Sequence, residues 1–203
     1  MSMSLLELIE SADERALAAG AVACLDRCLP LLTGPDGPEP LRPLWASCEN
    51  GRDWAIRLTA ARAELDEAAA RGGTDGDGEG GPAARVRAML AAAPSDFAPA
   101  PLREWADACS LVALEIHSRF DAPDGDAPQD TADLLKAARA GEAEGAGPLV
   151  AGELERQIRI LEILAETGGT AGSGAGVRKA LDLSTEGRRV LRAVMSRRAR
   201  IRG

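Results

Sequence analysis

The pattern of apolar and polar side chains along the chain predicts helices. The densest apolar run lies at 148–166, where large aliphatic side chains recur at helical spacing and Pro148 suits the first turn. On a helical wheel these side chains cover roughly 220° of the circumference, whereas an ordinary surface helix has an apolar stripe of about 100°. We therefore expect a central helix that other helices cover on more than one side.

The same spacing predicts three further long helices, at 11–32, 53–71 and 102–120. Ser11 and Glu14 have the spacing of a capping box, so the first of these is expected to begin at Ser11. Pro30 is expected to kink or end that helix. Shorter helices are expected at 44–48, 82–93 and 131–140.

The expected fold is all-α, an irregular antiparallel bundle of six to eight helices with long loops rich in Gly and Pro. No segment shows the two-residue alternation of a strand. We expect a bundle domain at 1–183 and a C-terminal helix at 184–203 that begins with Ser184 as its cap. A Gly-rich linker precedes this helix, which is expected to pack on the bundle or on a partner subunit.

Composition changes how the arginines are interpreted. Arg outnumbers Lys by 22 to 2, and Ala, Gly and Pro are frequent, which is the bias of a GC-rich genome. Arginine excess alone is therefore no signal for phosphate binding. Only 2% of the residues are aromatic, so the core is expected to consist of Leu, Ala, Val and Ile.

Charge is divided unevenly along the chain. The net charge is −8, yet residues 188–203 hold seven Arg and no acid. The other 17 basic and 32 acidic residues give −15, and such an acidic body disfavours nucleic acid as the main partner. The basic end is expected to dock on the acidic body, in the same chain or across a homodimer, or to contact nucleic acid. Candidate partner-binding residues are Arg188, Arg189, Arg192, Arg197 and Arg198.

The expected location is the cytoplasm. The N-terminus lacks the basic and apolar regions of a signal peptide, and no apolar run approaches the ~20 residues that span a bilayer. Four Cys at 24, 28, 48 and 109 do not form a regular disulfide framework, so we expect reduced thiols.

Three motifs hint at a metal or phosphate site, and each is incomplete. The four Cys and His117 lack the close ligand pairs of a zinc site. The acidic segment 75–80 begins like a calcium loop, but Val86 stands where the bidentate Glu belongs. The Gly-rich segment 168–176 lacks the Lys and the preceding strand of a P-loop. No metal or cofactor is expected.

Glu153 and Gln157 are the polar residues that enter the apolar arc of the central helix. Three interpretations stay open: an acid in an interior ligand pocket, a structural pairing with a neighbouring Arg, and a polar contact that fixes helix register. His117 and Trp105 lie on another helix and are the remaining ligand candidates.

The sequence favours a non-enzymatic interaction or regulatory protein, because it has one His, no Tyr and no catalytic motif. The alternative is a small-molecule binder or enzyme with an interior pocket near Glu153. A weaker alternative is contact with nucleic acid through the basic end. The expected partner is a protein or a second copy of the chain, and no membrane is expected.

Overall fold

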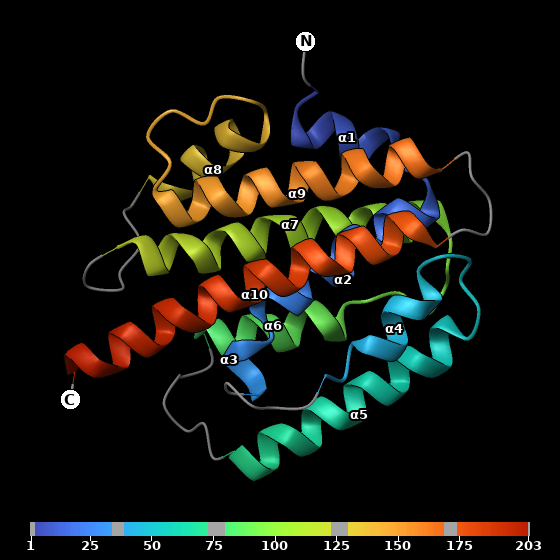
Figure 1. Ribbon diagram of the computed structural model, residues 1–203, viewed down its shortest axis with the longest axis horizontal. Coiled ribbons are helices and arrows are strands. Elements are labelled where there is room, and N and C mark those ends of the chain that lie inside the picture. The colour runs from blue at the N-terminus through green and yellow to red at the C-terminus, as the bar shows by residue number, and fades with distance from the viewer. Residues whose placement is uncertain (1–2, 34–38, 73–79, 123–129, 169–173, 203) are drawn as a thin grey trace.

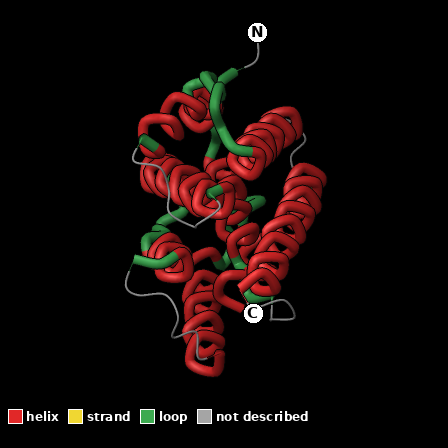
Figure 2. The backbone as a smooth tube through the Cα atoms, turned by 90° about the vertical axis from the view of Figure 1, so that its left-hand side faces the viewer, coloured by secondary structure: helices red, strands yellow, loops and turns green. Residues whose placement is uncertain are grey.

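The computed structural model describes residues 3–33, 39–72, 80–122, 130–168 and 174–202. Within these ranges the chain forms helices and no strand (Figure 2). The helices are α1 (Leu5–Ser11), α2 (Glu14–Cys28), α3 (Pro30–Thr33), α4 (Arg42–Ser47), α5 (Trp54–Gly72), α6 (Pro82–Ala91), α7 (Pro99–Asp121), α8 (Thr131–Arg139), α9 (Pro148–Thr167) and α10 (Ala175–Arg202). The all-α prediction is confirmed, but ten helices in the described ranges exceed the six to eight expected.

The predicted helix at 11–32 is wrong, because three helices cover this region. Ser11 is the last residue of α1, and its hydroxyl donates to the Glu7 carbonyl at 2.8 Å instead of capping a new helix. The cap of α2 is Asp13, whose carboxylate accepts from the backbone N–H of Ala16 at 2.8 Å. Pro30 ends α2 as predicted and opens α3.

The expected start of the last helix at Ser184 is also wrong, since α10 begins at Ala175. Ser184 lies in the middle of α10 and is buried. Its hydroxyl lies 2.8 Å from the carboxylate of Asp26 and 3.2 Å from the carbonyl of Ala23. A serine that bonds to α2 in this way is a packing residue of α10. Helix α7 likewise begins earlier than expected, because Pro99 fits the first turn, where no N–H bond is needed.

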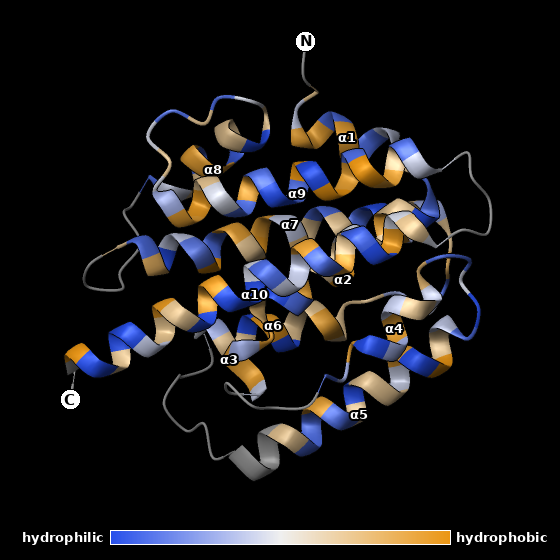
Figure 3. Cartoon of the chain, viewed as in Figure 1, coloured by the Kyte–Doolittle hydropathy of each residue, from blue (hydrophilic) through white to orange (hydrophobic). Residues whose placement is uncertain are grey.

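Although α2 is more fully buried, helix α9 is covered by several other helices. It contacts α2, α7 and α10, and α1 lies against it as well. Figure 1 shows α9 antiparallel to both α7 and α10. Its hydrophilic outer face, with Glu155 and Arg159 exposed, is visible in Figure 3. The apolar arc of α9 is thus covered on several sides, and its solvent-facing side carries Glu155 and Arg159 together with Ala151 and Ala165.

An aromatic group joins the peripheral helix α5 to the core. The ring of Trp54 in α5 lies edge-on to Trp105 of α7 and to Phe97, with centroids 5.9 Å and 5.4 Å apart. The indole N–H of Trp54 donates to the Pro94 carbonyl at 2.8 Å. Among the described residues, no helix has the length and apolar character needed to cross a membrane.

Candidate functional site

The two polar residues of the apolar arc of α9 both point into the bundle. Glu153 and Gln157 are one helical turn apart and hydrogen-bond to residues of α2 and α7. The side chain of Glu153 is 0% exposed, and Gln157 is also buried. A carboxylate removed from water needs a positive partner or several hydrogen bonds to stay ionised.

Arg27 of α2 supplies that partner. Its Nε donates to Oε2 of Glu153 at 2.7 Å, and its Nη2 donates to Oε1 at 2.6 Å. Burial by itself would raise the pKa of Glu153, but attraction to Arg27 and then to His117, together with hydrogen bonds, lowers that pKa below its ordinary value. Burial opposes the charge of Arg27 too, yet Glu153 raises the pKa of the guanidinium. The two side chains form a fully buried ion pair at neutral pH.

Gln157 and His117 extend this pair to α7. The Oε1 of Gln157 accepts from the Ser110 hydroxyl at 2.6 Å, and its Nε2 donates to Glu153 at 2.9 Å. Nδ1 of His117 lies 2.7 Å from a carbonyl oxygen, which only accepts, so this nitrogen carries the proton. Nε2 of His117 lies 3.7 Å from Glu153. We call this group the buried cluster: Arg27, Ser110, His117, Glu153 and Gln157.

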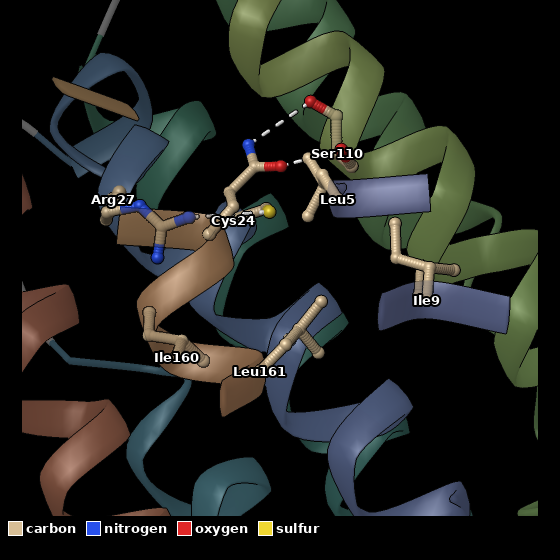
Figure 4. A pocket seen from close by; sticks show the side chains of 10 residues that line it. Leu5, Ile9, Cys24, Arg27, Ser110, Ile160 and Leu161 are labelled. Atoms are coloured by element: carbon tan, nitrogen blue, oxygen red, sulfur yellow. Dashed lines mark hydrogen bonds between the residues drawn. The ribbon is translucent and has the colours of Figure 1, made fainter. Parts of the chain in front are cut away.

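A small cavity of about 20 Å³ lies beside the buried cluster. Figure 4 shows Cys24, Arg27 and Ser110 around it, with apolar side chains of α1 and α9 as the other walls. About 10–15 Å³ holds one water, whereas sites for small molecules measure roughly 300–1,000 Å³. The cavity is therefore the size of a single water and not of a metabolite.

Arg27 and Ser110 are the two cluster residues that the sequence analysis did not name. Asp26 and Arg27 are the only charged residues between Ala16 and Leu32, and this isolation is a signal that they are buried with partners. The pattern does not say which acid pairs with Arg27, because Glu153 is 126 residues away.

Trp105 does not join the buried cluster. Its indole N–H donates to the Met89 carbonyl at 2.8 Å, and its ring packs on Trp54. Of the four ligand candidates from the sequence, the structure brings together Glu153, Gln157 and His117 and leaves Trp105 in the aromatic group.

Two of the five candidate arginines of α10 hold this helix on the bundle. Arg188 donates to Asp26 at 3.3 Å and to Glu39 at 2.9 Å. Arg198 donates to the carbonyls of Phe120 and Ala122, and its guanidinium lies 5.1 Å from the centre of the Phe120 ring. Basic residues thus bind the acidic body and a helix C-terminus of the same chain.

The other three candidate arginines have no acidic partner in the part of the chain that the structure describes. Arg189, Arg192 and Arg197 form no ion pair with any residue that the structure describes. Arg189 and Arg197 are exposed, and Arg192 is half-buried. The Nε of Arg192 is buried and has no hydrogen-bond partner in the described part of the chain. These three guanidinium groups are therefore available to an external acid.

The four thiols are free and buried in the core. Burial raises the pKa of Cys24 to about 12, and it raises the pKa of the other three thiols as well. They are protonated and unreactive at neutral pH. No group of His, Cys, Asp or Glu within the described ranges is arranged to hold a metal. The acidic segment 75–79 and residues 169–173 of the Gly-rich segment lie outside those ranges.

The chemistry available to the buried cluster is limited by its closure. Glu153 is ionised, both of its oxygens accept hydrogen bonds, and no nucleophile adjoins it in the cluster. We infer that the cluster fixes the positions of α2, α7 and α9 relative to one another.

No protein-family model, no curated protein and no solved structure matches this chain.

Proposed function

We propose that the protein is a non-enzymatic helical interaction module that binds acidic protein surface through the distal end of α10, residues 193–202. The observation that carries this proposal is the pair of exposed arginines, Arg197 and Arg200, which have no acidic partner among the described residues of a chain whose net charge is −8. Figure 1 shows this end of α10 extending away from the other helices.

An apolar residue completes this surface. Ile201 is 78% exposed and adjoins Arg200, and the tip of α10 is correspondingly apolar in Figure 3. An exposed aliphatic side chain among arginines suits a protein interface, where an apolar contact is surrounded by charged residues. Arg198, two residues before Arg200, anchors the helix to α7 and so holds the distal end in a fixed direction.

The partner we propose is a second copy of the chain. Outside residues 188–203 the charges sum to −15, so each copy offers an acidic body to the basic end of the other. Two such contacts related by a two-fold axis form a closed homodimer. The basic end is then neutralised without any other partner.

The closed surroundings of Glu153 support the non-enzymatic assignment over the alternative of an interior ligand pocket. A cavity of about 20 Å³ admits no substrate. We also propose a cytoplasmic location, with which four free thiols are compatible.

Light scattering at low and high salt tests this proposal. Wild-type protein is expected to form a dimer whose dissociation constant rises with salt, because the contacts are between exposed charges. Arg197→Glu should weaken the dimer about tenfold or more, whereas Arg52→Glu, an equal charge reversal at another exposed residue, should leave it unchanged.

Two results would overturn the proposal. One is a wild-type monomer at every salt and protein concentration. The other is an oligonucleotide that binds at physiological salt with a steep salt dependence carried by Arg197, which would assign the distal end to nucleic acid.

A further inference from the structure

A polar groove runs between the middle of α10 and the segment that follows α2. Its volume is about 180 Å³. One wall is a stripe of α10 whose members recur three, four and seven residues apart, as neighbours on one helix face do. We call it the α10 groove, and its polar lining consists of Thr33, Glu39, Thr185, Arg188, Arg189 and Arg192.

The three arginines of the α10 groove differ in whether a carboxylate is paired with them. Arg188 donates hydrogen bonds to the carboxylates of Asp26 and Glu39. Arg189 and Arg192 have no acidic partner among the described residues. The buried Nε of Arg192 also lacks an acceptor there, and a buried donor without an acceptor is destabilising.

Glu39 is the one carboxylate in the lining of the α10 groove. Its side chain is 49% exposed, so it can turn into solvent at little cost. It accepts from Arg188 at 2.9 Å, and both residues also line a second hollow of about 240 Å³. That second hollow shares Glu39, Thr185 and Arg188, and its other lining residues are Asp26, Arg42, Trp45, Leu181 and Asp182.

We propose that the α10 groove binds a phosphate monoester, with the phosphate on Arg188, Arg189 and Arg192 and the organic group in the second hollow. Guanidinium groups bind phosphate oxygens in pairs, and a dianion offsets the two charges that have no partner. The phosphate replaces Glu39 on Arg188, so this carboxylate acts as an internal competitor of the ligand. The second hollow, which has both charged and aromatic walls, suits a small polar group.

This site is independent of the dimer proposed above, because it uses Arg189 and Arg192, whereas the dimer uses Arg197 and Arg200. Loss of one function therefore leaves the other measurable. Arg189 and Arg192 stand out from the other arginines of the chain because they line one hollow and have no acidic partner among the described residues.

Titration calorimetry and backbone NMR of the full chain test the site, with inorganic phosphate, phosphoserine and glucose 6-phosphate as probes. Saturable binding is expected with a dissociation constant of about 1 mM or below for at least one ester, tighter than for inorganic phosphate. Arg192→Gln should raise that constant about tenfold or more. Glu39→Gln should lower it, because the competitor is removed.

Arg197→Gln is the matched control, since it removes the same charge outside the groove. Equal weakening by Arg192→Gln and Arg197→Gln would show general attraction of anions and would overturn the proposal. So would weaker binding in Glu39→Gln, or the absence of saturable binding by all three probes at low salt. Binding of inorganic phosphate with no gain for either ester would remove the organic group from the second hollow and leave a simple anion site.

Discussion

Asp26 and Arg27 are neighbours in α2, yet they form two ion pairs of different character. Arg27 points to α9 and meets Glu153 where neither side chain reaches solvent. Asp26 points to α10 and meets Arg188, which also binds the half-exposed Glu39. We call the first the inner pair and the second the outer pair.

The inner and outer pairs differ in what each charged side chain still contacts when its partner is lost. In the inner pair, loss of Arg27 leaves the buried Glu153 with only the Gln157 amide and with His117 at 3.7 Å. Loss of Glu153 leaves the buried Arg27 with no acid within hydrogen-bond distance among the described residues. In the outer pair Arg188 keeps Glu39 when Asp26 is lost, and Asp26 keeps the Ser184 hydroxyl when Arg188 is lost. The inner pair is therefore expected to fix the structure, whereas the outer pair can adjust to a ligand.

The largest effect is expected from Arg27→Met. It leaves the Glu153 carboxylate buried without its partner, and the free energy of unfolding should fall by about 3–5 kcal/mol in urea denaturation. The double variant Arg27→Met, Glu153→Met removes both charges at similar volume and should recover most of that loss. A double variant no more stable than Arg27→Met would mean that the inner pair acts through its shape and not its charge.

A smaller effect is expected from Gly187→Ala in α10, because the added methyl group would press on Arg27 of the inner pair. A Cβ at residue 187 would lie 2.5 Å from Cδ of Arg27, so Arg27 must move. We expect a loss of about 1–3 kcal/mol, although Ala normally favours a helix interior over Gly. Gly152→Ala in α9 is the control, because its Cβ meets only the mobile end of Arg156 at 3.2 Å. If both variants are stabilised, the contact of α10 with Arg27 is looser than the structure indicates.

The smallest effect is expected from Asp26→Asn, at about 1 kcal/mol or less near pH 7. Burial raises the pKa of Asp26, and Arg188 and Ser184 offset this only in part. The carboxyl therefore stabilises the fold most below its ordinary pKa of 3.8, and that contribution falls as the pH rises through the raised value. Glu153 has a lowered pKa, so its contribution is full above 4.5 and is lost as the pH falls.

Urea denaturation between pH 3 and 7 separates these two signs. As the pH rises, Asp26→Asn should gain stability relative to wild type, while Glu153→Gln should lose it. Parallel pH profiles for the two variants would contradict the division into an inner and an outer pair.

The sequence predicts the secondary structure well where apolar spacing is regular. The helix at 148–166 differs from α9 by one residue, because its apolar arc and Pro148 mark both its packing and its start. The predictions fail at Ser11 and Ser184, where a hydroxyl that could cap a helix is used for another bond. Local spacing does not show which bond a serine makes when tertiary partners compete for it.

The residues of the candidate site also fall into a group that the sequence predicts and a group that it does not. Polar residues in an apolar arc identify Glu153 and Gln157, because burial follows from helical periodicity. Their partners come from helices far away in sequence, and pairing across that distance depends on how helices cross. The sequence does not predict the groove at Arg192 for a further reason. It does not distinguish an arginine that has an acidic partner in the fold from one that has none.

The wide sequence separation of both pairs has a consequence for how the chain folds during its synthesis. Helix α2 is made before α9 and α10, and Glu153 and Arg188 follow 126 and 162 residues after their partners. At the usual rate of about 5–20 residues per second, Arg27 is made roughly 6–25 s before Glu153, and Asp26 roughly 8–32 s before Arg188. Two hydrated charges within the otherwise uncharged stretch 16–32 oppose early collapse around α2, and so they delay the closing of the core until α9 and α10 have emerged.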